Sequence, residues 1–391
     1  MKIHTPSHKR KPMSLRWWAW CFVYCILLAG CSTDNEQDEA DFVAADATYT
    51  HLAEYMSATT ILMHTPGNEN QGSYGLHKQF DVEGMKEEHL AFIHALQKNG
   101  IEVHEVIDLL RNAPMSRLQT IAKSISSEDV SQMDKELLIR HILDTPPMKG
   151  LYFTRDQSIT TPRGHVMGKM RLVHRKHEPA LIALCYEQLG EKIAYTIEGN
   201  NAYLEGGDYL PFGTLSFIGE GLRTNRAAIE ELLQADAIGH DTLVVVKDAL
   251  FNTSQMHLDT YFNIIDSNLV TLPSTRMNAQ AGESNHVAID IYTRAPGRLK
   301  YKQTTTNGSL VKFLQDRHIQ IIPISDEDEQ HFGSNYLCIA PRHIMVTDGV
   351  SEDFKKKMEH YKVKVEYIKL NELTEGNGCA HCMTQVLLRQ P

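Results

Sequence analysis

Short apolar segments alternate with longer amphipathic segments along most of the chain. Apolar, β-branched runs bounded by turn residues predict strands at 59–64, 101–106, 151–154, 202–204, 215–218, 242–246, 287–292, 319–324 and 363–368. Apolar residues at helical spacing predict helices at 84–99 and 225–235, near 309–316 and at 352–361. Several short helical patterns at about 107–147 indicate a small helical insertion. The alternation predicts an α/β or α+β fold.

The N-terminus has the pattern of a lipoprotein signal peptide. Five basic residues precede the uncharged apolar segment 17–29, which is too short to span a bilayer comfortably as a helix. Small residues then stand directly before Cys31, as at the site that a lipoprotein signal peptidase cleaves. An ordinary secretory signal or an N-terminal anchor helix is the alternative. We expect 1–30 to be removed and Cys31 to be lipidated, which anchors the protein to a membrane of the cell envelope, in the periplasm or at the cell surface.

The segment that follows is polar and acidic, so we expect 31–50 to be a flexible tether and 51–391 to be one catalytic domain. Five of the 39 lysine and arginine residues lie before Cys31 and none of the 49 acidic residues does, so the processed chain would hold 34 basic and 49 acidic residues. Such an acidic surface argues against nucleic acid as a partner.

Two other classes of protein are disfavoured. Gly219-Glu220-Gly221 lacks the further residues of a phosphate-binding loop, which argues against nucleotide binding. Four cysteines remain after the lipidation site, and they are scattered through a chain long enough to build its own core. A disulfide scaffold is therefore not predicted, although the sequence leaves open whether Cys379 pairs with another cysteine.

Four motifs carry residues that could do chemistry, each beside glycines or at the end of a strand-like run. They are Phe153-Thr154-Arg155-Asp156, Leu204-Glu205-Gly206-Gly207-Asp208, Met256-His257-Leu258-Asp259-Thr260 and Gly376-Asn377-Gly378-Cys379-Ala380-His381-Cys382-Met383-Thr384. Taken singly, each has a structural explanation: a turn, a tight loop, a pair of side chains on one face of a strand, or a disulfide, redox or zinc-binding Cys-x-x-Cys.

Taken together, the motifs suit the chemistry of a guanidinium group. Paired carboxylates can grip this planar cation through its fork of N–H donors. A thiolate is a natural nucleophile for its carbon, and a histidine held by a carboxylate can protonate departing ammonia.

In these motifs and their order the sequence resembles the arginine deiminase family, within the guanidino-group-modifying superfamily, over nearly all of 55–391. The resemblance implies a five-bladed α/β propeller of ββαβ units with the site in a central channel, and a reaction that needs no metal or organic cofactor. It also implies that Cys382 is the nucleophile and that Asp156 and Asp259 bind the guanidinium nitrogens. His257 would be the general acid and then the base, oriented by Glu205.

The far end of the substrate is expected to lie near two arginines. Arg175 and Arg223 match family positions that bind the substrate carboxylate, and Gly376 is counted among the substrate-binding positions. Two departures from the family pattern are Gly150, where an asparagine is usual, and Asn377, in a loop that usually has a basic residue there. They suggest room for a modified or larger arginine derivative.

The sequence therefore predicts hydrolysis of arginine to citrulline and ammonia through a covalent cysteine intermediate. Alternatives within the family are a hydrolase of substituted or C-terminal peptidyl arginine and an amidinotransferase. Alternatives from other classes are a lipoprotein that binds guanidino compounds without turnover and a Cys-x-x-Cys redox protein. The oligomeric state is not predicted.

Overall fold

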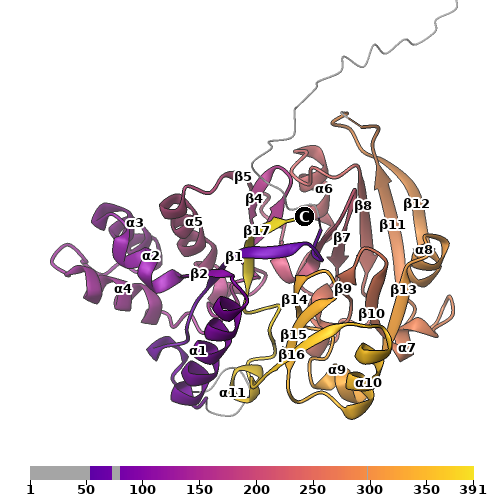
Figure 1. The fold of residues 1–391 in the computed structure, drawn as a ribbon. Helices are drawn as coiled ribbons and strands as arrows, with labels where there is room; N and C mark the ends of the chain where they lie inside the picture. Colours follow the sequence, from indigo (N-terminus) through magenta and orange to yellow (C-terminus); the bar gives the residue numbers. More distant parts are fainter. Residues whose placement is uncertain (1–52, 73–79, 297) are drawn as a thin grey trace, which may run out of the picture. The chain divides into compact units, whose positions relative to one another are not determined.

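The computed structural model describes residues 53–72, 80–296 and 298–391 (Figure 1). The predicted signal peptide, the lipidation site Cys31 and the whole predicted tether lie outside these residues. Within them, no helix is long and apolar enough to cross a membrane.

The strands of the described residues form five sheets. The first contains β17 (Gln385–Gln390), β1 (Ser57–Met63) and β2 (Glu102–Glu105); the second contains β3 (Ser158–Thr161), β4 (Gly164–Met167) and β5 (Ile193–Thr196). The third contains β6 (Tyr209–Phe212), β7 (Leu215–Glu220) and β8 (Thr242–Lys247), extended by β11 (Ala288–Thr293) and β12 (Lys302–Ser309). The fourth contains β9 (Asn263–Asp266), β10 (Leu269–Pro273) and β13 (Gln320–Ile324), and the fifth contains β14 (Leu337–Ala340), β15 (His343–Thr347) and β16 (Lys364–Ile368).

One pattern of pairing recurs in all five sheets. A middle strand is antiparallel to one neighbour and parallel to another strand that comes later in the chain. A parallel pair needs a long crossover connection, which here includes a helix in every case. These helices are α1 (Val82–Lys98), α5 (Glu178–Leu189), α6 (Arg226–Gln234), α8 (Leu310–Asp316) and α10 (Glu352–His360). The α/β class is confirmed, and ββαβ units recur, the first sheet being completed by the last strand of the chain.

Three helices occupy the predicted insertion: α2 (Val106–Asn112), α3 (Met115–Ile125) and α4 (Lys135–Asp144). Their apolar faces share a buried cluster with α5, beside which they lie in Figure 1. Three further short helices are α7 (Ser274–Met277), α9 (Asp326–Gln330) and α11 (Asn371–Thr374).

Two predicted strands are wrong. Residues 151–154 form turns, and 202–204 contain only an isolated bridge between Leu204 and Lys169. Leu151, Tyr152 and Phe153 are buried in two different apolar clusters. A buried turn therefore produces the same short apolar run as a buried strand, and the pattern alone does not separate them.

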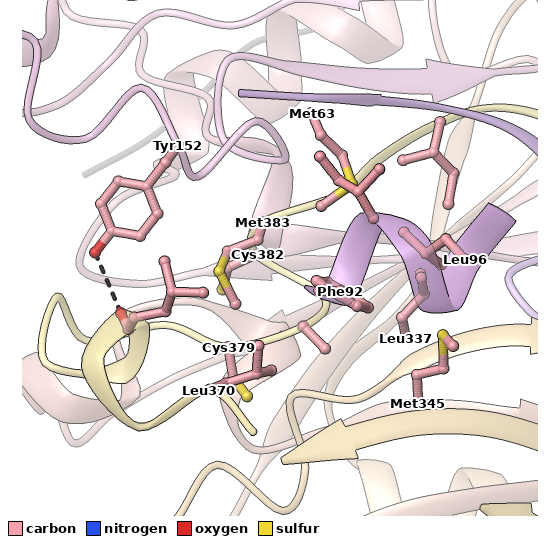
Figure 2. Packing of buried hydrophobic residues seen from close by; sticks show 14 of the residues in the cluster. Met63, Phe92, Leu96, Tyr152, Leu337, Met345, Leu370, Cys379, Cys382 and Met383 are labelled. Carbon is pink, nitrogen blue, oxygen red and sulfur yellow. Dashed lines mark hydrogen bonds between the residues drawn. The ribbon is translucent and has the colours of Figure 1, made fainter. Parts of the chain in front are cut away.

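The loop that carries Cys382 is packed on the apolar core. Helix α1 begins after Asp81, whose side chain accepts a hydrogen bond from the Gly84 backbone, and buries Phe92 and Leu96. Figure 2 shows both side chains in the same cluster as Cys382. Movement of the C-terminal loop would therefore disturb the packing between α1 and the first sheet.

A buried arginine joins this sheet to the rest of the protein. Arg389 of β17 is fully buried and donates hydrogen bonds to the carbonyl oxygens of Met56 (2.7 Å) and Cys338 (2.8 Å). Its guanidinium also pairs with Glu54 at 2.6 Å. Arg155 approaches the same carboxylate at 3.5 Å. Glu54 thus keeps its charge inside the protein because two guanidinium groups compensate it.

We predict that Arg389→Ala lowers the free energy of unfolding by about 3–5 kcal/mol, because it leaves a buried carboxylate short of its main partner. Urea unfolding measures the change. Arg140→Ala, which removes an exposed arginine from α4, is the control and should stay within about 0.5 kcal/mol of the unmodified protein. A similar small change for Arg389→Ala would contradict the prediction.

Candidate active site

Each of the four motifs lies just before the strand that pairs antiparallel with the middle strand of a sheet, which we call the first strand of that sheet. Asp156 precedes β3, Glu205 precedes β6, His257 and Asp259 precede β9, and Cys382 precedes β17. The expectation that His257 and Asp259 share one face of a strand is wrong. His257 caps the one-turn helix η5 (Leu258–Thr260), so the pair lies in a turn that leads into β9.

Hydrogen bonds join the four motifs in a closed order. The backbone or side-chain bonds between successive motifs are Arg155 N to Cys382 O (3.1 Å), Gly206 N to Asp156 O (2.9 Å), Leu258 N to Asp208 Oδ1 (2.9 Å) and His381 Nδ1 with Asp259 Oδ2 (2.7 Å). Segments that are far apart in the sequence are therefore held together by their own polar groups. The structure brings Asp156, Glu205, His257, Asp259 and Cys382 into one buried site, as the sequence predicts.

The centre of this site contains a buried histidine–carboxylate pair. His257 Nε2 lies 2.8 Å from Glu205 Oε2, and both side chains are almost fully buried. Burial opposes the charge on His257, but Asp156, Glu205 and Asp208 outweigh it and raise its pKa to about 9. Burial also opposes the charge on Glu205, yet its bond with His257 keeps the pKa well below the usual value. The imidazole is thus protonated at neutral pH and can act as an acid.

Glycine is required beside this pair. A Cβ on Gly207 would meet the imidazole ring of His257 at 2.8 Å from Nδ1. Gly207 therefore lets the loop approach the histidine closely, whereas Gly206 lies against the carbonyl oxygens of Arg155 and Ser158.

Two buried carboxylate oxygens of this site have no hydrogen-bond partner within the part of the chain that the structure describes. They are Oδ1 of Asp156, which lies 3.7 Å from His257 Nδ1, and Oδ1 of Asp259. The other oxygen of each is engaged: Asp156 Oδ2 accepts from Arg175 (2.6 Å), and Asp259 Oδ2 bonds with His381. Buried polar atoms are nearly always satisfied, so a pair of exceptions at one site points to a missing donor.

The thiol of Cys382 lies beside these acids. Its Sγ is 3.5 Å from Asp259 Oδ2 and 3.2 Å from Asn335 Nδ2, and Figure 2 shows the cysteine next to Met383 in the apolar cluster. Burial raises its pKa well above the usual value, and the negative charges of Asp259 and Asp156 raise it further. The free protein therefore holds Cys382 as a neutral thiol at neutral pH.

Arg175 is held inside the protein rather than left open. Its guanidinium bonds to Asp156 (2.6 Å), to Glu178 (2.7 Å) and to the carbonyl oxygen of Gly150 (2.8 Å). A side chain at position 150 would overlap this guanidinium. The room that Gly150 was expected to open for a larger substrate is thus filled by Arg175.

The other two predicted substrate-binding residues lie in different surroundings. Arg223 makes a longer contact with Glu205 (3.4 Å), and its side chain is 11% exposed. Gly376 lies against the hydroxyl of Tyr152, which donates to the carbonyl oxygen of Leu373 at 3.3 Å. Tyr152 and the neighbouring Phe153 thereby connect the C-terminal loop to the turn that carries Asp156.

Sequence reasoning missed four residues of the site. Asp208 and His381 stand inside the predicted motifs, so the sequence offered a signal for both. Glu54 and Asn335 stand outside the motifs, and nothing in the sequence marked them as site residues. His381 bridges Asp259 and Glu54, with Nε2 at 3.1 Å from Glu54 Oε1. Asp208 accepts from the backbone of Leu258, next to His257, and burial raises its pKa to about 7.

A cation could also be bound within this site. One oxygen or nitrogen atom from each of Asp156, Glu205 and His257 lies within 4.8 Å of the others. Asp156 already pairs with Arg175, however, and Glu205 with Arg223. A metal ion would therefore compete with these two guanidinium groups.

The Cys-x-x-Cys pair is not a disulfide. Cys379 and Cys382 are both free and buried, as are Cys185 and Cys338. Burial raises the pKa of Cys379 to about 12, and it is the sulfur of Cys382, not that of Cys379, that is hydrogen-bonded by Asn335 and lies beside Asp259.

Comparison with known proteins decides the family. The family model described as arginine deiminase matches residues 115–389. The chain belongs to the arginine deiminase family. Among its relatives is the arginine deiminase of Latilactobacillus sakei, 26% identical over 310 residues that cover 72% of this chain and 73% of that protein. The arginine deiminase of Limosilactobacillus reuteri is 25% identical over 401 residues, which cover 85% and 95%.

Solved structures agree on the fold of this arginine deiminase family member. A mutant of DDAH from Pseudomonas aeruginosa in complex with citrulline matches with a TM-score of 0.56 at 17% identity, over 85% of this chain and 100% of that chain. The N-terminal domain of ArgZ, an arginine dihydrolase from cyanobacteria, matches with a TM-score of 0.58 at 16% identity, over 85% and 98%.

We predict that Glu205→Gln moves the titration of the His257 imidazole to lower pH. Removing the carboxylate removes a charge that favours the protonated ring, so the ring loses its proton before pH 9 rather than near it. NMR titration of the histidine ring measures the shift. Glu191→Gln is a matched control because Glu191 pairs with a different buried histidine, His165, at 3.2 Å. An unchanged His257 titration in Glu205→Gln would refute the assignment.

Proposed function

We propose that this arginine deiminase family member hydrolyses the guanidinium group of free arginine to citrulline and ammonia. One observation carries the proposal: two buried carboxylate oxygens, on Asp156 and Asp259, accept no hydrogen bond from the described residues, and the negative charge of both acids acts on the thiol of Cys382. A guanidinium presents several N–H donors in one plane and can satisfy both oxygens at once.

Binding of this cation would also activate the nucleophile. The acids that raise the pKa of Cys382 in the free protein become neutralised by the substrate, so the thiol gives up its proton to solvent water as the guanidinium binds, and His257 keeps its own proton. Reactivity is then highest in the bound state, because the free protein holds this buried cysteine as a thiol rather than a thiolate.

The reaction proceeds in two stages. The Cys382 sulfur forms a bond to the guanidino carbon, and protonated His257 gives its proton to the departing nitrogen, which leaves as ammonia. Water then attacks the thiouronium-type intermediate, and neutral His257 takes a proton from it. The carbon–sulfur bond breaks, citrulline forms and the thiol is restored. Glu205 holds the imidazole in the required orientation throughout, at 2.8 Å.

The two arginines take different roles in this proposal. Arg175 is committed to Asp156 and Glu178, so it mainly positions the carboxylate that grips the guanidinium. Arg223 has longer contacts and partial exposure, which suits it to bind the substrate carboxylate. A side chain at Gly376 would collide with the hydroxyl of Tyr152, and the place of Gly376 near the substrate stays a prediction.

We predict that the protein forms citrulline and ammonia from arginine, and that Cys382→Ser loses at least about 1,000-fold in kcat. Citrulline and ammonia assays measure turnover, and intact mass after an acid quench detects the adduct on Cys382. The control Cys379→Ser should retain the adduct. A panel of N-substituted arginines, C-terminal arginyl peptides and amine acceptors tests the other reactions of the family. Turnover of one of these with none of arginine would overturn the choice of substrate.

The finer description of the fold belongs to the same proposal. The five sheets would be the blades of a propeller, with the first strand of each sheet nearest the centre. The closed order of hydrogen bonds among the motifs before these strands supports the arrangement.

The N-terminal anchor is a further part of the proposal. Lipidation of Cys31 would hold the enzyme at a membrane of the cell envelope, where it would act on arginine outside the cytoplasm. The support is the basic and apolar leader that ends in Leu27-Leu28-Ala29-Gly30-Cys31.

We predict that the full chain, expressed in bacteria, incorporates labelled fatty acid and sediments with membranes. Cys31→Ser should lose the label while keeping the fold of the enzyme. Fatty-acid labelling followed by gel analysis measures this outcome. Equal labelling of both forms, or of neither, would be incompatible with lipidation at Cys31.

A further inference from the structure

The fifth sheet also places a polar residue in the site. Four sheets carry the predicted motifs directly before their first strands, and in the fifth sheet the corresponding segment is Gly333-Ser334-Asn335 before β14. Asn335 stands two residues before β14, as Asp156 stands two residues before β3. The repeated architecture therefore brings Asn335 to the position that is occupied by reactive residues in the other sheets.

The side chain of Asn335 is fully buried and contacts the nucleophile. Its Nδ2 donates to Cys382 Sγ at 3.2 Å and to the carbonyl oxygen of Asp259 at 3.2 Å. Its Oδ1 accepts from the backbone N–H groups of Cys379 (3.0 Å) and Cys382 (3.3 Å). One amide thus links the nucleophile to the motif that carries Asp259.

These contacts fix which way the amide points. The two backbone N–H groups require an acceptor, so they hold the oxygen of Asn335 toward the loop and leave the nitrogen facing the sulfur. The backbone on either side is also held, because Asn263 donates to the carbonyl oxygens of Ser334 (3.0 Å) and Tyr336 (2.9 Å). The donor is therefore in place before any thiolate forms.

We propose that Asn335 is a further catalytic residue, whose amide N–H stabilises the Cys382 thiolate while its oxygen holds the nucleophile loop. A neutral donor suits this position, since a lysine or arginine there would pair with Asp259 and compete with a cationic substrate. The inference rests on the proposed thiolate chemistry of Cys382, but its test does not require turnover.

The test compares Asn335→Ala and Asn335→Asp with the unmodified full chain. Both variants lose the N–H that faces the sulfur, and Asn335→Asp keeps the shape and an acceptor for the loop. Thr384→Val is the matched control, because Thr384 donates to the carbonyl oxygens of Ala380 and His381 in the same loop without contacting the sulfur.

The readout is the rate at which iodoacetamide alkylates Cys382, followed by mass spectrometry over a range of pH. Below the thiol pKa this rate is proportional to the fraction of thiolate. We expect both Asn335 variants to react about 10- to 100-fold more slowly at a given pH, the effect of losing one hydrogen bond to a charged group. Thr384→Val should keep the pH profile of the unmodified protein, and kcat should fall in the Asn335 variants with little change in KM.

The outcomes separate the two proposals. If citrulline is not formed by the unmodified protein, yet the Asn335 variants shift the alkylation profile, the proposed function fails and the role of Asn335 stands. If Asn335→Asp is folded by circular dichroism and alkylated with the same pH profile as the unmodified protein, the role of Asn335 is overturned. Should Asn335→Ala fail to fold, the isosteric Asn335→Asp decides alone. Loss of folding in both variants, with Thr384→Val folded, also overturns it in favour of a purely structural role.

Discussion

The structure depends on keeping negative charge inside the protein. A buried carboxylate is costly unless a cation or several N–H groups compensate it. Glu54 is compensated by Arg389, Glu178 by Arg175, and Glu205 by His257. After these pairings, one oxygen each on Asp156 and Asp259 remains without a hydrogen bond. The substrate that completes the site must therefore be a cation with several N–H donors. A guanidinium is such a cation, and the guanidinium groups of Arg389 and Arg175 pair with buried carboxylates in the same protein.

The same charges connect the site to the fold. Asp259 bonds to His381, His381 bonds to Glu54, and Glu54 pairs with Arg389 of the last strand. These buried groups connect the site around Cys382 to the first sheet, in which β1 and β17 pair with each other. The catalytic loop consequently shares its polar partners with the segment that completes the first sheet, and stability and activity are coupled through them.

The chemistry of the site was easier to predict from the sequence than the elements that position it. Asp156, Glu205, His257, Asp259 and Cys382 could be identified because glycines and strand-like runs mark their motifs, and the structure gathers all five. Asn335 carried no such signal, because an asparagine near a strand is usual in turns. Very short strands such as β3 and β5 were missed because four residues are too few for a period to emerge, while the buried turn at 151–154 imitated a strand. The short strands and the position of Asn335 depend on pairing between segments that are distant in the sequence, and local sequence patterns do not encode such pairing.

The choice between free and modified arginine follows from one substitution. In the sequence, Gly150 predicts extra room for the substrate, since it lacks the side chain that is usual at this position of the family. The structure gives the opposite consequence: the missing side chain lets Arg175 reach the Gly150 carbonyl and bind Asp156 and Glu178 at the same time. The volume is used by a guanidinium that belongs to the protein, and a bulky substituent on the substrate would have to displace it from two buried carboxylates. Breaking buried ion pairs is strongly unfavourable. The contacts of Gly150 therefore support the proposal of a compact substrate such as free arginine.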